Sequence, residues 1–544
     1  MLFSCGKGAR TLLVTVPLAM PLWPQSLVSF AASVLTTRTA GRLAKIKDVG
    51  PQQQATWRRL VQQAGATRFW PGHGLEPGIS YELFRRRLAP RTHADLRTAI
   101  DRMQTGEANV LWPGSCTFFA SGIGNGRIVP VTSAMLDHFR TACRDALLYY
   151  TARTGHAGVV KGRHLCLNGT TALQPIATGT THRAFVGSWS AIAALNLPKW
   201  ADARVYEPGA DIAALNDWEA KCEAILDRTL GRDVTLVAAG PTWLLDFAEH
   251  LRRRPTPTGR AITRLADVWP NLECYVHDGV PVTPYQDELR EALGPDVQFH
   301  ELFSGSEGVF AAQDSVKSGE LRLMTGVGVF YEFLPWAEFN EPRLEGLAER
   351  VVPLSEVKPG LDYVVVASTP AGLIRYVTGD VVRFASVAPP RLTYVGRTEQ
   401  ALTTFGERVL ERDLTDVLVA VCRSHRWRLV NFHVAPLQER SLTGHSRGRH
   451  EWWIELRPGT VETPTGPQMA VELDRALQAV QPTYAERRQA GRLEAPFVRL
   501  VMPGVFRHWM RFHHKWDGQS RMARCRNDRV VADELAQITR FAGD

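Results

Sequence analysis

"RIVPVT" (residues 127–132) leads directly into "SAMLDHFRTACRDALLYYTART" (133–154), and "HLCLNG" (164–169) follows after a short link. The first and third stretches are short apolar runs that predict strands, and the middle one has apolar residues at helical spacing. The order helix, strand, helix returns over residues 217–254. Alternating strands and helices predict an α/β fold in which helices cover a sheet.

A second pattern begins after "YVGRTEQ" (394–400). There the stretch 403–424, two further apolar runs and a predicted helix at 466–481 have their own apolar positions. A chain of 544 residues exceeds what one hydrophobic core usually holds. We therefore predict a large N-terminal domain of β-sheets and helices over 1–397 and a smaller α+β C-terminal lid domain over 398–544.

The composition is that of an ordinary folded protein. Apolar residues make up 44% and charged residues 22%, which excludes a disordered, fibrous or membrane-embedded chain. The net charge of +9 suits an anionic ligand but does not decide for nucleic acid. Eight cysteines show no CxxC pair and no Cys/His cluster at zinc-ligand spacing. We expect buried thiols in a reducing compartment and hence a cytoplasmic protein.

The N-terminus leaves a second localisation open. Lys7 and Arg10 precede the apolar stretch 11–35, and a secretory signal has the same basic start and apolar body. Three prolines interrupt this stretch, which makes it too broken for a membrane-spanning helix. A packed N-terminal helix or a start codon placed too early fits better than export.

A glycine-rich loop lies between two predicted strands in "FFASGIGNGRIVPVT" (118–132). Its candidate nucleotide-binding residues are Ser121, Gly122, Gly124, Gly126 and Arg127. Glycines let successive N–H groups converge on phosphate oxygens, while an arginine adds positive charge. The spacing fits neither a Walker loop nor a dinucleotide-binding fingerprint, so a purely structural loop stays open.

A second polar loop follows a strand in "FHELFSGSEGVFAAQ" (299–313). Ser304 and Ser306 could face a nucleotide there, and Glu307 could ligate Mg²⁺, which prefers carboxylate and phosphate oxygens. The alternative is a surface turn whose glutamate is solvated.

A third stretch, "IRYVTGDVVRF" (374–384), predicts two strands joined by a turn at Gly379 and Asp380. Such a dipeptide often makes a hairpin turn and nothing more. A carboxylate at this place gains a function only if the rest of the chain binds a nucleotide.

These stretches and their order, followed by "GR" and a basic C-terminal segment, resemble the adenylate-forming superfamily that includes acyl-CoA synthetases and luciferase. The phrases between them resemble more closely the Gretchen Hagen family of acyl acid amido synthetases, the auxin-responsive plant enzymes and their bacterial relatives. The phrases are "VLWPG" (110–114), "AGPTWLL" (239–245), "LADVWPNLECYVHDGVPVTPY" (265–285), "GVFYEFLP" (328–335) and "TTFGERVLE" (403–411). The resemblance extends from about residue 50 to 540.

The resemblance implies an ATP- and Mg²⁺-dependent ligase. A carboxylic acid attacks the α-phosphate of ATP to form an acyl adenylate, and an amino acid amine then displaces AMP. Asp380 would hold the ribose hydroxyls, since one carboxylate accepts two hydrogen bonds. Arg397 would reach ribose or phosphate, and Tyr376 either packs near the adenine or belongs to the core. Mg²⁺ on Glu307 would offset charge in the transition state.

The family builds its acyl pocket from helices of the large domain. The candidates here are Phe139, Trp189, Trp243 and Leu244. They would suit an aromatic or cyclic acid, although aromatic residues at helical spacing are also typical of a core.

Two departures from the family pattern affect the phosphate site. Ile123 and Gly124 stand where the family loop usually has two hydroxyl residues, which removes two donors to phosphate. In the C-terminal segment 513–529, Arg521 stands at the position of the family lysine. Arginine keeps the positive charge but is a broader fork, and Lys515 is the alternative catalytic cation.

Three hypotheses follow. The leading one is a ligase that joins a small-molecule carboxylic acid to an amino acid. The second is an adenylating enzyme with another acceptor such as coenzyme A, and the third is a catalytically weak relative that binds acid or nucleotide as a sensor. We expect a monomer that binds neither nucleic acid nor a membrane. The C-terminal domain is expected to rotate about residues 397–400 as a lid.

Overall fold

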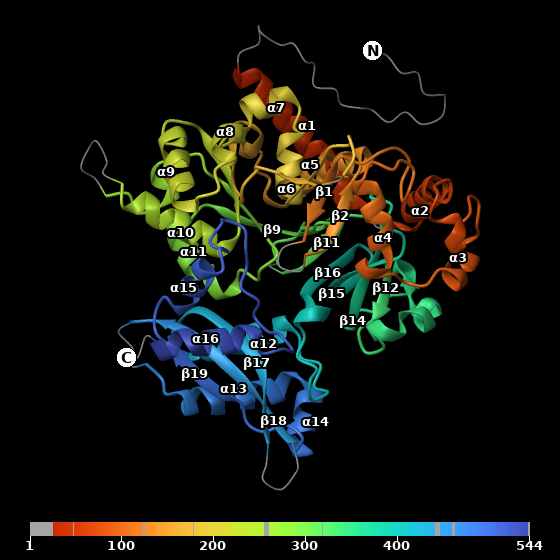
Figure 1. Ribbon diagram of the computed structural model, residues 1–544. Helices are drawn as coiled ribbons and strands as arrows, with labels where there is room; N and C mark the ends of the chain where they lie inside the picture. The colour runs from red at the N-terminus through yellow and green to blue at the C-terminus, as the bar shows by residue number, and fades with distance from the viewer. Residues whose placement is uncertain are drawn as a thin grey trace.

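The structure is a computed structural model, and it describes residues 25–46, 48–122, 126–177, 179–254, 261–317, 319–440, 446–459 and 463–541. The strands of these residues form three sheets. Figure 1 shows the largest sheet in the upper part of the molecule and the C-terminal elements below it.

The largest sheet has twelve strands in the described part of the chain, with a parallel part of five strands and an antiparallel part of seven. Its parallel strands, in spatial order, are β9 (Gln298–Gly305), β8 (Cys274–Asp278), β7 (Val234–Ala239), β3 (Arg163–Leu167) and β6 (Tyr206–Glu207). From β9 the antiparallel part continues through β10 (Gly308–Gln313), β11 (Leu321–Leu323), β16 (Pro390–Arg397), β15 (Tyr376–Val387), β14 (Asp362–Ser368), β12 (Phe330–Pro335) and β13 (Val352–Pro353). Parallel strands end at the same edge, so the loops after β3, β7, β8 and β9 come together there.

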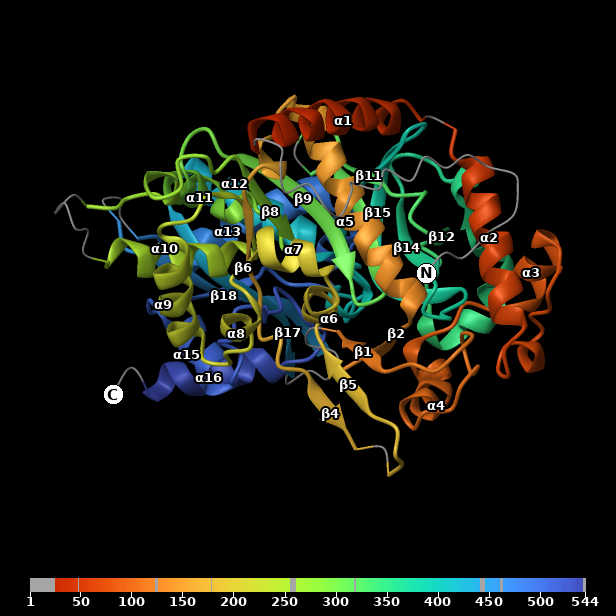
Figure 2. The same cartoon turned by 90° about the horizontal axis from the view of Figure 1, so that it is seen from above.

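Helices cover both faces of the parallel part (Figure 2). One set consists of α1 (Gln25–Lys45), α5 (Ser133–Thr154), α6 (Trp189–Leu195) and α7 (Lys199–Arg204). The other consists of α8 (Ala210–Ala213), α9 (Trp218–Thr229), α10 (Pro241–Arg252) and α11 (Gln286–Leu293). Val237 and Tyr275 pack in the core of the second set, whereas Leu236 and Cys274, which alternate with them, pack with Tyr150 of α5. This alternation gives each face of the sheet its own apolar core.

Helix α5 has the bounds that the sequence predicts, 133–154. The side chain of Thr132 accepts a hydrogen bond from the backbone N–H of Met135 at 3.1 Å, which caps the first turn. Gly155 follows the last turn with φ +72°, a conformation that glycine adopts at low cost. The predicted α/β class is confirmed.

The N-terminal elements form a second, smaller layer. A four-stranded sheet consists of β2 (Ile128–Val131), β1 (Phe118–Ser121), β5 (Ala184–Gly187) and β4 (Gln174–Ile176). Three helices lie near it in sequence: α2 (Gly50–Gly65), α3 (Tyr81–Arg87) and α4 (His93–Gln104). The glycine-rich loop predicted between two strands therefore joins β1 to β2.

The C-terminal elements have the predicted α+β character. Their strands are β17 (Arg428–Arg440), β18 (Ser446–Arg457) and β19 (Phe497–Val501). Their helices are α12 (Glu411–Ser424), α13 (Gly466–Val480), α14 (Pro482–Gln489), α15 (Val505–Phe512) and α16 (Val530–Phe541). The boundary at 397/398 stays a prediction.

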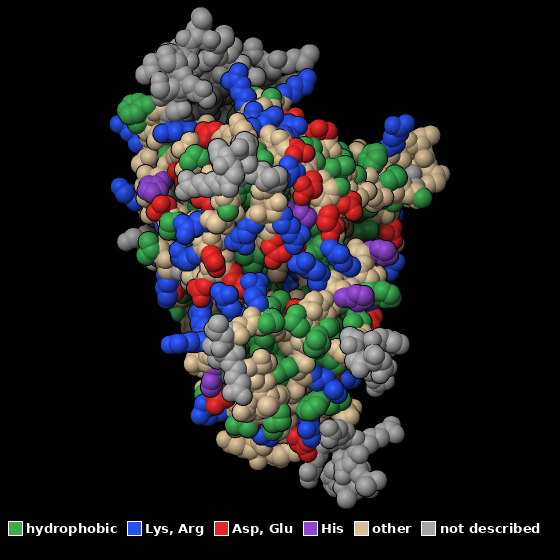
Figure 3. All heavy atoms as spheres, turned by 90° about the vertical axis from the view of Figure 1, so that its left-hand side faces the viewer, with side chains coloured by type: hydrophobic (Ala, Val, Ile, Leu, Met, Phe, Trp, Pro, Cys, Tyr) green, Lys and Arg blue, Asp and Glu red, His purple; other side chains and the backbone are tan. Residues whose placement is uncertain are grey.

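Several expectations concern the surface and the N-terminus. Most of the apolar stretch 11–35 lies outside the described residues, and α1 begins at Gln25 and packs along α5. None of the described helices is both long enough and apolar enough to cross a bilayer. The seven described cysteines are free thiols. On the face in Figure 3, Lys and Arg side chains are interspersed with Asp and Glu, so positive charge is not concentrated there in one block.

A buried arginine ties several elements together. Arg375 is fully buried and has φ +49°. Its Nε lies 3.0 Å from a carboxylate oxygen of Glu332, and its guanidinium also donates to the carbonyls of Arg85, Leu88 and Ala348. These contacts connect β15 to β12, to α3 and to the helical turn after β12. Burial raises the pKa of Glu332, and the positive charge of Arg375 opposes that rise.

We predict that Arg375→Ala lowers the free energy of unfolding by about 3–5 kcal/mol, because it leaves the Glu332 carboxylate buried without its cation. Urea denaturation followed by circular dichroism measures this. Arg68→Ala is the matched control, since Arg68 is 61% exposed in its pair with Glu107 and should cost less than about 1 kcal/mol. Equal losses in the two variants would contradict the prediction.

Candidate functional site

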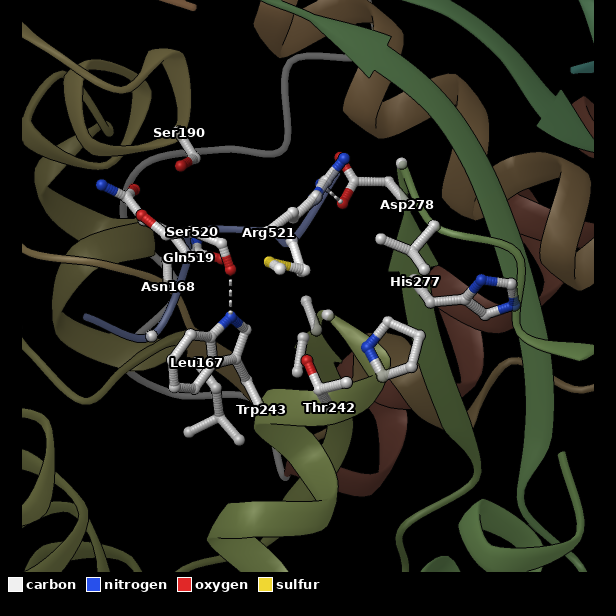
Figure 4. Close-up of a pocket in the computed structure, with 18 of the residues that line it drawn as sticks. Leu167, Asn168, Ser190, Thr242, Trp243, His277, Asp278, Gln519, Ser520 and Arg521 are labelled. Carbon is white, nitrogen blue, oxygen red and sulfur yellow. Dashed lines mark hydrogen bonds and ion pairs between the residues drawn. The ribbon is translucent and has the colours of Figure 1, made fainter. Parts of the chain in front are cut away.

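A cleft of about 1050 Å³ lies where the carboxyl ends of the parallel strands face the C-terminal elements. Residues from the ends of β3, β7, β8 and β9 line one side, and residues between 503 and 526 line the other. Figure 4 shows Asn168, Trp243 and Asp278 of the sheet side opposite Gln519 and Arg521. Open α/β sheets bind ligands at this edge.

Asp380 and Arg397 form one wall of the cleft. They are direct neighbours on β15 and β16, and Nε of Arg397 lies 3.2 Å from Oδ1 of Asp380. Asp380 is only 2% exposed, so burial raises its pKa, and the charge of Arg397 partly offsets that effect. The same carboxylate raises the pKa of Arg397. The geometry places a paired, buried carboxylate at the cleft.

The turn predicted at Gly379 and Asp380 is wrong. Both residues lie inside one continuous strand, β15. Val364 of β14 pairs with Val381 and Val366 with Val377, so β15 has extra residues and bulges. Gly379 has φ +85° within this bulge, a conformation that glycine accepts readily. Asp380 follows directly after this glycine and keeps its place opposite Arg397 in the pairing of β15 with β16.

Ser306 and Glu307 form the turn between β9 and β10, since Gly305 pairs with Gly308. Ser304 and Ser306 line the cleft. Glu307 is 4% exposed and accepts a hydrogen bond of 2.8 Å from the Ser306 hydroxyl, so it is not the solvated residue of a surface turn. It lies close enough to Asp380 to contribute to the raised pKa of that carboxyl.

The glycine-rich loop reaches the cleft through Ser121 and Gly122, whereas Ile123 and Gly124 lie outside the described residues. Gly126, with φ +65°, and Arg127 are not among the lining residues. Arg127 instead donates to the carbonyl of Thr378 at 3.0 Å and pairs with Glu399. Through these contacts Arg127 connects the glycine-rich loop to the β15 bulge.

Arg521 reaches across the cleft to the end of β8. Its guanidinium lies 3.1 Å from Oδ1 of Asp278 (Figure 4). The Ser304 hydroxyl donates to Oδ2 of Asp278 at 2.6 Å. Asp278 is not among the site residues that the sequence motifs predicted. Its signal was an aspartate-glycine pair directly after a buried strand, within the quoted phrase 265–285.

The segment around Arg521 is held in the cleft by several contacts. Asp517 accepts hydrogen bonds from the backbone of Gln519 and Ser520, which fixes the local turn. The indole of Trp243 donates to the Ser520 carbonyl at 3.2 Å, and its ring lies 4.7 Å from that of Trp516. The segment therefore covers the carboxyl ends of β3, β7 and β8.

Lys515, the other catalytic candidate, also lines the cleft. Its ammonium group lies 4.7 Å from the centre of the Trp509 ring. The described residues therefore give Lys515 an aromatic neighbour, while Arg521 has a carboxylate.

Of the candidates for the acyl pocket and the adenine site, some line the cleft and others lie in the hydrophobic core. Trp189 and Trp243 line the cleft. Phe139 is 1% exposed and stacks on Trp189 with 5.0 Å between ring centres, and Leu244 of α10 is fully buried in the core that α10 shares with α9. Tyr376 is fully buried in the N-terminal core and does not line the cleft. Phe139, Leu244 and Tyr376 thus belong to the core, from which Phe139 supports the pocket wall.

The sequence of this chain matches models of known protein domains. Models for the GH3 family N-terminal, central and C-terminal domains match residues 43–298, 322–397 and 412–530. The chain belongs to the GH3 family. The resemblance drawn from the sequence motifs is confirmed.

Curated GH3 relatives are distant and match in part. "Probable indole-3-acetic acid-amido synthetase GH3.12" of Oryza sativa subsp. japonica is 26% identical over 58% of this chain and 54% of its own length. "Indole-3-acetic acid-amido synthetase GH3.10" of Arabidopsis thaliana is 32% identical over 39% and 36%. The chain thus spans about half the length, or less, of the curated relatives that it matches.

Solved structures show the same fold over nearly the whole chain. GH3.15 acyl acid amido synthetase aligns with a TM-score of 0.69 at 18% identity, over 96% of this chain and 97% of that one. A 2-hydroxyisobutyryl-CoA ligase in the postadenylation state aligns with a TM-score of 0.54 at 15% identity, over 91% of each. The large α/β domain with a smaller C-terminal domain is therefore a fold shared with adenylate-forming ligases.

We predict that removing the Arg521–Asp278 pair loosens the segment 516–521. Arg521→Ala and Asp278→Asn should each speed amide hydrogen exchange there up to about fivefold, because a partly exposed ion pair stabilises by about 1 kcal/mol at most. Mass spectrometry of deuterium uptake gives the rate. Arg526→Ala is the control, since its pair with Asp528 stays within the C-terminal part. Unchanged exchange in both cleft variants would contradict the prediction.

Proposed function

We propose that this GH3 protein is an ATP-dependent acyl acid amido synthetase. It adenylates a carboxylic acid and transfers the acyl group to the amine of an amino acid. One observation carries the proposal: Ser304, Ser306, Asp380 and Arg397 line the same cleft as Arg521, which comes from the C-terminal part. The names of the GH3 relatives as amido synthetases support it.

Asp380 and Arg397 suit the ribose of ATP. A carboxylate has about four acceptor positions, so Asp380 can keep its contact with Arg397 and still accept bonds from both ribose hydroxyls. Ser304 and Ser306 are the neighbouring hydroxyl groups, and each would turn from its present acceptor, Asp278 or Glu307, to donate to a phosphate oxygen. Arg521 lies on the opposite side, where it can offset charge on the α-phosphate.

The reaction balances in two steps. A carboxylate oxygen of the acid attacks the α-phosphorus, the bond from that phosphorus to the bridging oxygen breaks, and pyrophosphate leaves. The amine nitrogen then attacks the acyl carbon, loses a proton, and AMP leaves. Donors and cations fixed around the phosphorus stabilise the charge that develops in the first step.

The residues present fit a magnesium ion that arrives with ATP. Glu307 is not itself among the residues that line the cleft, but it is a buried acceptor at the turn beside the lining residues Ser304 and Ser306. No cluster of three potential metal ligands occurs among the residues the structure describes, so nucleotide oxygens and water would complete the shell, as Mg²⁺ prefers. When bound, the ion neutralises charge on the phosphates.

ATP/pyrophosphate exchange over a panel of aryl, indolyl and fatty acids tests the proposal. We expect exchange that depends on the acid, followed by amide formation when amino acids are added. Product analysis with coenzyme A in place of amino acids tests the other acceptor. No exchange with any acid, in protein that binds ATP, would overturn the proposal and favour the sensor hypothesis.

We predict that Asp380→Asn weakens ATP binding by on the order of 100-fold, because two bonds from ribose hydroxyls to a charged acceptor become bonds to a neutral one. Calorimetric titration with ATP measures the loss. Asp362→Asn, which removes a carboxylate paired with Arg383 on the same sheet, should leave the affinity for ATP unchanged. Comparable losses in the two variants would refute the role of Asp380.

We predict that Glu307→Gln raises the Mg²⁺ concentration needed for half-maximal exchange by about tenfold, since the amide is a weaker ligand than a carboxylate. Exchange rates over a Mg²⁺ series give this value. Glu301→Gln, on the same strand-turn-strand unit, is the control. The same Mg²⁺ dependence in Glu307→Gln as in the unchanged protein would remove Glu307 from the site.

A further inference from the structure

The cleft continues inward along the face of the sheet that α5, α6 and α7 cover. We call this part the inner chamber. Small and apolar side chains form its walls: Cys143, Ala146, Cys166, Leu236, Ala238 and Val276. None of these wall side chains carries a charge near neutral pH, and burial raises the pKa of both thiols. The inner chamber therefore suits the neutral, apolar body of a ligand.

Two polar side chains stand at its far end. His164 of β3 and Tyr206 of β6 are direct neighbours in the sheet register, and both line the cleft. Partners in register on adjacent strands present their side chains on the same face, about 4.8 Å apart. His300, the register partner of Val276 on β9, also lines the cleft, and burial lowers its pKa to about 3 and keeps it neutral. Apart from this neutral ring, the chamber is apolar and ends in one polar pair.

The hydrogen bond of His164 fixes what this pair can bind. Its Nε2 lies 2.7 Å from the carbonyl of Val159, and a carbonyl only accepts, so Nε2 carries the proton. Burial lowers the pKa of His164 and favours the neutral ring. Its Nδ1 is then an acceptor. Within the described part of the chain, neither Nδ1 of His164 nor the hydroxyl of Tyr206 has a hydrogen-bond partner.

The depth of the pair sets the length of the ligand. His164 lies four residues before Asn168, which follows the carboxyl end of β3 and lines the cleft (Figure 4). Four residues of a strand span about 13 Å. An extended carbon chain of about ten bonds covers the same distance, since three backbone bonds span about 3.3–3.6 Å.

We propose that the acid is an elongated, neutral acid with a hydroxyl group at the end remote from its carboxyl group. The hydroxyl donates to Nδ1 of His164 and accepts from the hydroxyl of Tyr206. The carboxyl end then lies at the edge of the sheet, beside Ser304 and Arg521. This inference rests on the proposed function, because it takes the inner chamber as the site of the acyl group.

The test uses the pair decanoic acid and 10-hydroxydecanoic acid, titrated calorimetrically into the full-length protein without ATP. We expect the hydroxy acid to bind about tenfold more tightly, which is the effect of one or two neutral hydrogen bonds. Tyr206→Phe should reduce that preference to about threefold or less and leave the affinity for decanoic acid unchanged. Tyr363→Phe is the control, because it removes a tyrosine hydroxyl that bonds the backbone of Lys358 elsewhere in the domain.

The outcomes separate this inference from the proposed function. Equal affinities of the unchanged protein for the two acids overturn the inference, whether or not Tyr206→Phe folds. A preference that persists unchanged in Tyr206→Phe also overturns it. Acid-dependent ATP/pyrophosphate exchange, together with equal affinities for the two acids, would support the proposed function and contradict the inference. The protein could also prefer the hydroxy acid, lose that preference in Tyr206→Phe and show no ATP/pyrophosphate exchange. This outcome would support the inference and contradict the proposed adenylation.

Discussion

Parallel pairing of β3, β7, β8 and β9 is the constraint on which the rest of the structure depends. Because these strands run in one direction, their carboxyl ends share one edge, and residues far apart in the chain meet there. Asn168, Trp243, Asp278 and Ser304 arrive in this way from four successive strand ends. The antiparallel part of the same sheet adds Asp380 at the β15 bulge, and so extends the site beyond the parallel strands.

Several charged side chains that are buried in the described part of the chain have a partner of opposite charge. Glu207 is fully buried and contacts three arginines, and Arg375 has Glu332 together with three carbonyls. Asp380 likewise forms an ion pair with Arg397. A buried carboxylate without a cation is costly, so these pairs fix the relative positions of the strands that carry them. The pair of Asp380 and Arg397 forms a wall of the cleft, so the same interaction also fixes the position of that wall.

Much of the fold followed from the sequence. The bounds of α5 were predictable because its apolar spacing, its Thr132 cap and the glycine after it agree. The β15 bulge was not predictable, since Gly379 and Asp380 between apolar runs read equally as a turn. The site was predicted in part. Local motifs gave Asp380 and Ser304, but Asp278 is a single residue at a strand end, and its role depends on a partner 243 positions away. Phe139 and Leu244 belong to the core because which side of a helix faces a cavity is set by packing, not by spacing.

The segment 516–521 lies in the cleft, where it contacts Trp243 and Asp278. The same segment holds Arg521, the cation nearest to the end of β8. While it lies there, it covers the strand ends through which a substrate would reach the inner chamber. Substrate entry and the reaction therefore require two different positions of this segment. The segment would have to leave the cleft to admit a substrate and return before the reaction begins.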